Sequence, residues 1–383
     1  MRIAMVGPFG FEPNRTTMRS RALNLARPLA RRGHKVAIFM PPWRMPAEAG
    51  RVWEEDDVLI VNTAVSGGVP GITRALIRTI RRWQPDLVHS FKPKAYSGLT
   101  AWWFWQLHRG QYKLITDTDD WEGWGGWNDR APYTPRQKRF FAWQEQWGLR
   151  HNHLLTVASR ALETIALSMG IPQDRILYLP NGPGISIPRQ TSPRKPGDPP
   201  TLLLYSRLFE FDTRRLLRIL QEVVGAVPGV RIRFVGSGLV AQDTAAFRRQ
   251  LQEADLLEFV EDIGYVAGEH LPTVLLGGDA GIFLMDDTLL NRTKCPVKLA
   301  DMAALGIPVV GDAVGQVRDY VDHGRTGYLH PPGAAAAIAA DLVRLLQDRA
   351  ERERLGSAAR RHMQQQFNWN QLAARLETAY LEL

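Results

Sequence analysis

The sequence has very little cysteine and no long apolar run. Its 383 residues contain one cysteine, which excludes an internal disulfide and any metal site built from several cysteines. A lone thiol suits a reducing cytoplasm. No apolar run approaches the ~20 residues that cross a bilayer, and the start, MRIAMVGPFG, is too short and glycine-bound for a signal peptide. We therefore expect a cytoplasmic protein, with peripheral binding to the inner face of the membrane left open.

The chain carries an excess of positive charge. Its 48 Lys and Arg residues against 39 Asp and Glu residues give a net charge of +9 at pH 7. Such a surface attracts polyanions, which include nucleic acid, anionic lipid and phosphorylated ligands. The sequence contains no nucleic-acid recognition motif. We therefore expect no nucleic-acid partner and keep an anionic membrane surface as a candidate.

Short β-rich apolar runs alternate with helical patterns twice along the chain, as in proteins built on buried parallel sheets. A stretch rich in proline and polar residues, 183–200, separates the two series and is typical of a linker. The length also favours two domains, because one core rarely exceeds ~250–300 residues. The predicted strands are residues 2–7, 35–40, 58–62, 86–91 and 113–119 before the linker, and 201–206, 231–236, 257–266, 280–285 and 307–312 after it.

This pattern predicts an α/β protein of two doubly wound, Rossmann-like domains. We assign residues 1–185 to the first domain, 186–199 to the linker and 200–367 to the second domain. The terminal amphipathic helix, 368–383, can pack back on the first domain or on the second. In open parallel sheets ligands bind beyond the carboxyl ends of the strands, so the candidate site residues are those in loops that follow strands.

The segment NRTKCPVKLADMAALGIPVVGD, residues 291–312, is the clearest candidate for a ligand site. Pro296 suits the first position of a helix, whose free N–H groups and dipole favour a diphosphate. Lys294 and Lys298 add positive charge, and Asp301 could accept hydrogen bonds from two ribose hydroxyls. The segment therefore predicts a nucleoside-diphosphate site. The alternative is an ordinary helix start with surface lysines and an acid that the helix dipole favours.

Several motifs, in order along the chain, resemble those of one enzyme family. LARRGHKVAIF, VASRALETIALSMGIPQDRILYLPNGPG, YSRLFEF, FVGSG and VKLADMAALGIPVVGD resemble elements of the retaining GT-B glycosyltransferases of family 4. The resemblance implies the GT-B fold, with an acceptor-side domain and a donor-binding domain facing a cleft. It also implies transfer of a sugar, an activity of the EC 2.4 type, from a nucleotide-diphosphate donor to a sugar or lipid-linked acceptor such as a polysaccharide precursor. No metal and no other cofactor is expected.

The resemblance assigns donor-binding residues. Asp301 stands at the second glutamate of the family's Glu-x7-Glu motif, which binds ribose, and Arg207 stands at its diphosphate-binding arginine. The backbone near Val266 would hold the edge of the base, and two glycines would let the nucleotide approach. The donor set is Arg207, Gly236, Gly238, Val266, Lys294, Lys298, Leu299 and Asp301.

Two positions depart from the family's pattern. Thr293 stands where the first glutamate of that motif is expected, and Asp212 stands where a diphosphate-binding lysine is usual. An aspartate repels a diphosphate, so the positive charge must come from elsewhere, first from Lys298 and then from Lys294 or Arg292. Two alternatives to the transferase stay open: a catalytically weak GT-B binding protein, and a nucleotide-sugar epimerase or hydrolase on the same fold.

The loop DTDDWEGWGGW, residues 117–127, follows a predicted strand and gathers acids beside tryptophans and glycines. Clustered carboxylates can have raised pKa values and could orient a sugar or take a proton. In relatives a residue of this loop contacts the donor sugar, and Thr118 or Asp119 takes its place here. An acid that caps the following helix is the alternative. We predict catalytic roles for Asp119, Asp117 and Asp120.

Acceptor contacts are expected from other loops of the first domain. Lys92 and Lys94 follow a strand and could meet an acceptor's phosphate, although a solvated lysine pair is the alternative. Asn14 and Arg15 lie in the first loop. His89 lies within a strand, where a packed core residue is the simpler expectation.

Aromatic and basic residues of the first domain allow a membrane hypothesis. Trp102, Trp103 and Trp105 lie on one predicted helix, where packing in the core is the simpler expectation. The first predicted helix is crowded with arginines and has hardly any acid, which suits an anionic membrane surface. A solvated basic face is the alternative.

Overall fold

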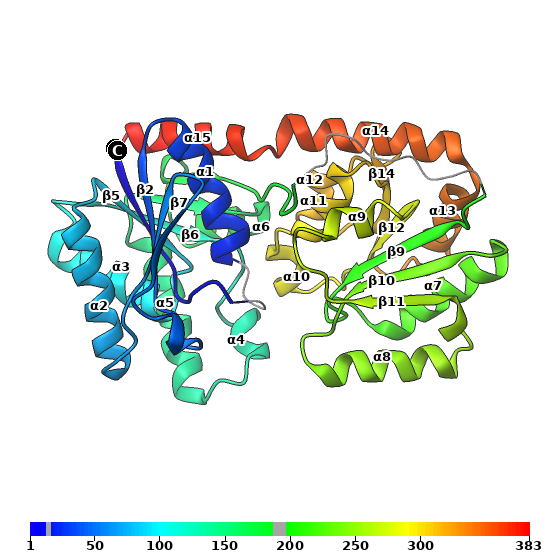
Figure 1. The fold of residues 1–383 in the computed structure, drawn as a ribbon, viewed down its shortest axis with the longest axis horizontal. Coiled ribbons are helices and arrows are strands. Elements are labelled where there is room, and N and C mark those ends of the chain that lie inside the picture. The colour runs from blue at the N-terminus through cyan, green and yellow to red at the C-terminus, as the bar shows by residue number, and fades with distance from the viewer. Residues whose placement is uncertain (13–16, 187–196) are drawn as a thin grey trace. The chain divides into compact units, whose positions relative to one another are not determined.

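The computed structural model describes residues 1–12, 17–186 and 197–383. Asn14, Arg15 and most of the predicted linker lie outside these residues. The chain forms two compact units. In Figure 1 the chain runs from blue and cyan in unit 1 to green, yellow and orange in unit 2, and it returns to unit 1 at its red C-terminal end. Unit 1 comprises Met1–Asn181, Thr293–Cys295 and Trp369–Leu383, and unit 2 comprises Gly182–Arg292 and Pro296–Asn368.

Unit 1 is built on an eight-stranded sheet in the order β3-β4-β2-β1-β5-β6-β7-β8. All neighbouring pairs are parallel except β3 and β4, which form an antiparallel pair at one edge. The strands are β1 (Arg2–Val6), β2 (Lys35–Met40), β3 (Val52–Glu55), β4 (Val58–Asn62), β5 (Leu87–Phe91), β6 (Lys113–Thr118), β7 (Leu154–Val157) and β8 (Ile176–Tyr178).

Helices cover the sheet of unit 1 because the connections between parallel strands must cross back over its faces. The last helix of the chain, α15 (Trp369–Leu381), packs against α1 (Leu23–Arg31), and Leu372 and Leu376 join the apolar cluster that contains Leu25. The other helices are α2 (Gly68–Trp83), α3 (Ala95–His108), α4 (Trp127–Arg130), α5 (Pro135–Arg150) and α6 (Arg160–Ser168).

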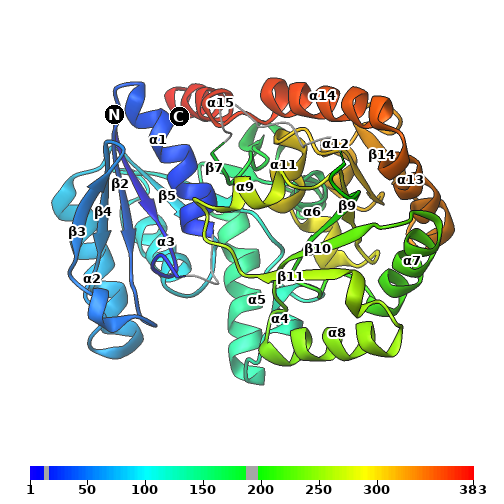
Figure 2. The same cartoon turned by 45° about the vertical axis from the view of Figure 1, so that its right-hand side comes forward.

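Unit 2 is built on a six-stranded, wholly parallel sheet in the order β11-β10-β9-β12-β13-β14. Figure 2 shows β9, β10 and β11 side by side. The strands are β9 (Thr201–Ser206), β10 (Arg231–Gly236), β11 (Val260–Gly264), β12 (Ala280–Phe283), β13 (Val309–Asp312) and β14 (Gly327–His330).

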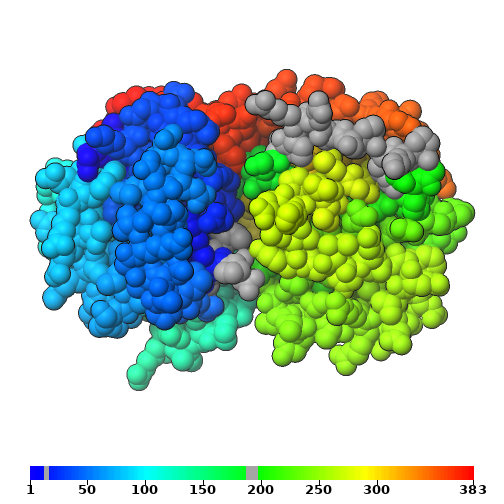
Figure 3. All heavy atoms as spheres, in the orientation of Figure 1, coloured from blue at the N-terminus to red at the C-terminus, as the bar shows by residue number. Residues whose placement is uncertain are grey.

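The helices of unit 2 also alternate with its strands, so the prediction of two doubly wound, Rossmann-like sheets is confirmed. Figure 3 shows how the side chains cover the sheets and helices of each unit on one face. The helices are α7 (Thr213–Ala226), α8 (Ala241–Glu253), α9 (Leu271–Leu275), α10 (Leu289–Thr293), α11 (Val297–Ala304), α12 (Val317–Tyr320), α13 (Ala335–Gln347) and α14 (Arg349–Gln366).

Two expectations about single residues have clear outcomes. His89 is fully buried within β5, between the Tyr380 hydroxyl at 2.6 Å and Thr156, so its prediction as a core residue is confirmed. The expectation that Trp102 packs in the core is wrong, since 38% of this residue is exposed on α3. Among the helices that the structure describes, none combines the length and the apolar character needed to cross a membrane.

Candidate functional site

The carboxyl edge of the unit 2 sheet carries an arginine, Arg207, that no described residue neutralises. Arg207 follows β9 directly and is partly buried, and its side chain makes no hydrogen bond or ion pair with any residue that the structure describes. Arg215, at the start of α7, contrasts with it because its guanidinium lies 2.7 Å from Asp312 and 3.0 Å from Asp286. Arg207 is therefore available to an anionic ligand at this edge.

Asp301 lies on α11, which begins at Val297 after Pro296 as the N-cap, one residue later than predicted. The residue is 2% exposed, and the Gly184 N–H donates to its Oδ1 at 2.7 Å. Burial raises the pKa of Asp301 to about 7, although hydrogen bonds from the Gly184 and Ile185 backbone and the charge of Lys298 oppose the rise. The carboxyl group thus titrates near neutral pH.

Two tyrosines that the sequence did not single out lie in this region: Tyr205 near Asp301, and Tyr265 near Tyr205. The Lys298 ammonium group is 5.1 Å from the ring centroid of Tyr205, at the end of β9. Burial raises the pKa of Tyr205, and the nearby Asp301 and Tyr265 raise it further. Tyr265 is 68% exposed and precedes Val266, whose backbone was predicted to hold a base. The sequence feature that could have indicated Tyr205 is its place at the polar end of the apolar strand TLLLYS.

The fold itself requires glycine at the two positions that were predicted to contact the nucleotide, Gly236 and Gly238. Gly236 has φ +120°, and a Cβ there would lie 2.2 Å from the Ser206 carbonyl oxygen. A Cβ on Gly238 would lie 2.3 Å from that of Asp243. Both positions therefore require glycine for packing after β10, whatever their contact with a ligand.

Asp212, which departs from the family's pattern, is the N-cap of α7. Its Oδ1 accepts from the Arg214 N–H at 3.0 Å, and its Oδ2 lies 3.1 Å from the Arg214 guanidinium. A capping aspartate satisfies a free N–H group of the first turn. The substitution thus has a local structural role, and Arg214 offsets its charge.

In unit 1, Asp117 is held in a buried ion pair. Arg21 donates to both of its oxygens, from Nε to Oδ1 at 2.8 Å and from a terminal nitrogen to Oδ2 at 2.7 Å. The Thr156 hydroxyl donates to Oδ2 at 2.6 Å, and Arg21 also donates to Asn181. The Asp117 and Arg21 side chains are 0% and 1% exposed. This geometry favours a structural role for Asp117 over the predicted catalytic one, because its oxygens are already occupied.

Lys92 joins the acids of the loop after β6. Its ammonium group lies 3.0 Å from Asp119, 3.3 Å from Asp120 and 2.8 Å from Glu122. The Thr17 hydroxyl donates to Asp119 at 3.0 Å. Burial raises the pKa of Asp120, and Lys92 opposes that rise. Asp119 and Asp120 are thus gathered around one cation at the carboxyl edge of the sheet.

Lys94 is also committed to an ion pair, with Glu122, and its ammonium group is 4.7 Å from the ring centroid of Tyr133. Lys92 and Lys94 are both buried, so the structure gives them carboxylate partners where an acceptor phosphate was predicted. Lys92 and Ala95 have φ +56° and +50°, which are strained values for residues with a side chain. Ion pairs hold this strained turn against the acidic loop.

Two further acids of this region, Glu122 and Glu145, were not among the predicted catalytic residues, although Glu122 belongs to the predicted acidic loop. Although burial opposes the shift, Lys92 and Lys94 hold the pKa of Glu122 at about 2. Glu145 lies fully buried on α5, where burial and the charge of Glu122 raise its pKa well above the usual value. Glu145 could have been noticed as the one acid among the aromatic residues of α5. No group of three or more Asp, Glu, His or Cys in the described ranges is arranged to hold a metal ion.

Lys294 belongs to unit 1, although it was predicted to bind the donor. It is buried, its ammonium group is 5.4 Å from the ring centroid of Trp127, and its charge acts on Asp120. The neighbouring Thr293 carbonyl accepts from the Ser159 hydroxyl at 2.7 Å. These contacts place Lys294 beside the acidic loop.

Family models match both units. The model "Glycosyl transferase 4-like domain" matches residues 16–182, and the model "Glycosyl transferases group 1" matches residues 199–348. The fold is similar to that of sucrose-phosphate synthase from Thermosynechococcus elongatus, with a TM-score of 0.75 and 20% identity over 100% of this chain and 98% of that chain. The HepE protein of Anabaena, solved in complex with UDP and glucose, gives a TM-score of 0.71 at 16% identity, with 100% of both chains covered.

The curated relatives are distant. The N-acetyl-α-D-glucosaminyl L-malate synthase of Bacillus anthracis is 23% identical over 176 residues, which is 46% of this chain and 45% of that protein. The amylovoran biosynthesis glycosyltransferase AmsK of Erwinia amylovora is 31% identical, over 35% of this chain and 34% of that protein. The chain thus matches less than half the length of these relatives. The matches favour the predicted transferase over the binding-protein and epimerase or hydrolase alternatives, and the chain belongs to the GT-B glycosyltransferases of the family 4 type.

Proposed function

We propose that this chain transfers a sugar from a nucleoside-diphosphate donor to an acceptor hydroxyl, with retention of configuration at the anomeric carbon. The observation that carries the proposal is Arg207, a partly buried cation at the carboxyl edge of the unit 2 sheet that has no counter-ion within residues 1–12, 17–186 and 197–383. A fold keeps such a charge at low cost only where solvent or an anionic ligand meets it. A diphosphate is an anion of suitable size and charge.

The donor-side roles follow from the geometry of unit 2. Arg207, Lys298 and the N–H groups at the start of α11 would stabilise the charge that develops on the leaving diphosphate. A carboxylate offers about four acceptor sites, so Asp301 can accept from Gly184 and Ile185 and still bind ribose hydroxyls. Tyr265, exposed beside Val266, would lie near the base.

The bond changes need no protein nucleophile. The bond from the acceptor oxygen to the anomeric carbon forms while the bond from that carbon to the diphosphate oxygen breaks. The acceptor's proton passes to the leaving diphosphate, and the incoming oxygen approaches from the face that the diphosphate leaves. In unit 1, Asp119 and Asp120 would orient sugar hydroxyls, while Lys92 holds both carboxylates in place. No metal is required in this scheme.

UDP is the first nucleotide to test, because HepE was solved with UDP and glucose. The acceptor is proposed to be a saccharide or a lipid-linked sugar of a polysaccharide precursor, which agrees with the name of the amylovoran relative. Peripheral binding to an anionic membrane surface belongs to the same proposal. It would use the arginines near the start of the chain, such as Arg19 and Arg31.

The test is a thermal-shift measurement with UDP, GDP, TDP and ADP. A nucleotide at about 100 times its dissociation constant adds ~2.7 kcal/mol of stability, which shifts the midpoint by several degrees. We expect one nucleotide to stabilise the wild type and to lose most of this effect in Arg207→Gln. The matched control is Arg231→Gln, an exposed arginine at the opposite edge of the same sheet. The proposal fails if no nucleotide shifts the midpoint, or if both variants lose the shift equally.

A further inference from the structure

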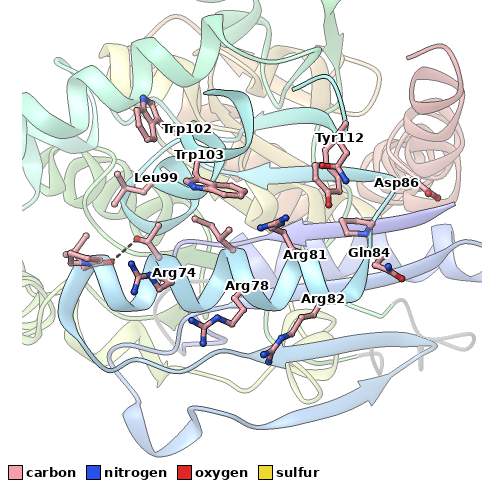
Figure 4. Close-up of a pocket in the computed structure, with 16 residues that line it drawn as sticks. Arg74, Arg78, Arg81, Arg82, Gln84, Asp86, Leu99, Trp102, Trp103 and Tyr112 are labelled. Atoms are coloured by element: carbon pink, nitrogen blue, oxygen red, sulfur yellow. Dashed lines mark hydrogen bonds between the residues drawn. The ribbon is translucent and has the colours of Figure 1, made fainter. Parts of the chain in front are cut away.

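A concave surface lies within unit 1 and is lined by other residues than those of the loops described above. It is a groove of about 1220 Å³ between α2 and α3, drawn in Figure 4. None of the predicted donor, acceptor or catalytic residues lines it. The function of the groove is therefore not accounted for by the residues at the carboxyl edge.

One wall of the groove is a row of arginines. Arg74, Arg78, Arg81 and Arg82 follow one another along α2, a helix that contains no acid. Arg74, Arg78 and Arg82 are exposed and form no ion pair with any residue in the described ranges. The single acid lining the described groove, Asp86, lies at its far end and accepts from the Arg2 N–H at 2.6 Å. The wall is thus strongly positive and uncompensated.

The other wall is aromatic. Trp102 and Trp103 lie on α3 across from the arginines in Figure 4, and 38% of Trp102 is exposed. Arg81 points toward Trp103, with its guanidinium carbon 5.6 Å from the ring centroid. An exposed indole offers an apolar face and a polar N–H group at low entropic cost. Such a face matches the C–H face of a sugar ring.

The groove runs the length of the sheet. Val69 and Leu99 lie near the starts of α2 and α3, which follow the carboxyl ends of β4 and β5. Asp86 and Gln111 lie just before β5 and β6, at the amino edge. Since α2 has 16 residues, its axis spans ~24 Å. An extended chain in the groove could therefore have one end at the carboxyl edge, where the acidic loop of unit 1 lies.

We propose that this groove binds an extended acidic saccharide, the chain of the acceptor that the enzyme elongates or decorates. The inference deepens the proposed function by naming the chemical class of the acceptor, and it rests on that function. Arginines pair with carboxylate or sulfate groups, and the tryptophans stack on sugar rings. A concave groove lined on two sides suits a single extended chain better than the flat surface of a bilayer.

The experiment measures binding of a fluorescein-labelled oligogalacturonate to the full chain by fluorescence anisotropy. We expect Arg74→Gln combined with Arg78→Gln to weaken binding at least about fivefold, since each exposed charge pair contributes a factor of a few. Trp102→Ala should weaken it similarly through loss of the stacking face. The control combines Arg249→Gln with Arg361→Gln, two exposed arginines of unit 2, and changes the net charge equally. It should leave the affinity within twofold of the wild type.

Three outcomes overturn the inference. One is an equal loss in the control, which would show attraction by net charge alone. Another is equally tight binding of a neutral labelled maltooligosaccharide. The third is no binding of oligogalacturonate while vesicles of phosphatidylglycerol and phosphatidylcholine bind in a way that depends on Arg74 and Arg78, which would make the surface a membrane site. The nucleotide thermal shift is measured on the same variants. If it persists while oligogalacturonate fails to bind, the groove inference fails and the proposed function stands.

Discussion

Replacing Asp301 by asparagine should make the chain more stable above neutral pH. Burial raises the pKa of this carboxyl group to about 7, whereas it is near 3.9 in an unfolded chain. Between these values the folded state holds a proton that the unfolded state has released. Stability of the wild type must therefore fall as pH rises through this window. An asparagine has no proton to lose, and its Oδ1 can still accept from the Gly184 N–H.

The magnitude follows from the shift. One unit of pKa difference corresponds to ~1.4 kcal/mol, so a shift of about three units can contribute at most about 4 kcal/mol. Between pH 5 and pH 7 the wild type should lose about 2–3 kcal/mol relative to Asp301→Asn, with little further change above pH 8. Backbone hydrogen bonds and the charge of Lys298 are already included in the shifted value.

The assay is urea unfolding of both proteins at pH 5, 6, 7 and 8, followed by tryptophan fluorescence and circular dichroism. The control is Glu222→Gln, which removes an exposed acid of α7 in the same unit. Its stability difference from the wild type should not depend on pH in this range. The reasoning is refuted if the difference between Asp301→Asn and the wild type is also constant from pH 5 to pH 8.

Two further predictions concern the scaffold of each unit. Arg21→Met should cost about 3–5 kcal/mol in urea unfolding, because it leaves the buried Asp117 carboxylate without its cation. Arg19→Met, which removes a guanidinium 3.4 Å from Glu55 at the surface, should cost less than about 1 kcal/mol, and equal losses would contradict this account. Gly236→Ala should cost roughly 3 kcal/mol by the same measurement, because φ is +120° and the new Cβ would meet the Ser206 carbonyl. Gly225→Ala, within α7 and without a neighbour inside 4 Å, should be neutral or stabilising by up to about 1 kcal/mol, and a loss there as large as that of Gly236→Ala would be inconsistent with the argument.

The strands that the sequence predicted well are those with long apolar runs. Residues 35–40, 58–62, 201–206 and 231–236 agree with β2, β4, β9 and β10. Four strands were missed. Three of them, β3, β8 and β14, lie at sheet edges, have only three or four residues and are partly exposed. The fourth, β7, is an interior strand of only four residues, all buried. The predicted strand 257–266 was too long, since a helical turn, Leu257–Phe259, occupies its start. A short apolar run does not distinguish these conformations by periodicity.

The candidate site was predicted in outline, as loops after strands. The resemblance to the family assigned Arg207 and Asp301 to one donor site, and Lys298 was added as a source of positive charge there. In a doubly wound fold such residues are expected in the loops that follow strands. It could not predict that Lys92 would meet three carboxylates, or that Lys94 would pair with Glu122. Those pairs depend on how close the loop after β5 comes to the loop after β6, which residue spacing does not specify.

By itself, the sequence determined the fold class and the family, because both depend on local patterns: apolar runs of strand length, helices between them, and short motifs in a fixed order. Only the tertiary structure decided which charges are available. It paired Arg21 with Asp117, 96 positions along the chain. It left Arg207 and the arginines of α2 without a carboxylate partner in the part of the chain that the structure describes. The sequence determines which residues are charged. Whether a charge is neutralised depends on contacts of a few ångströms between segments that are far apart along the chain.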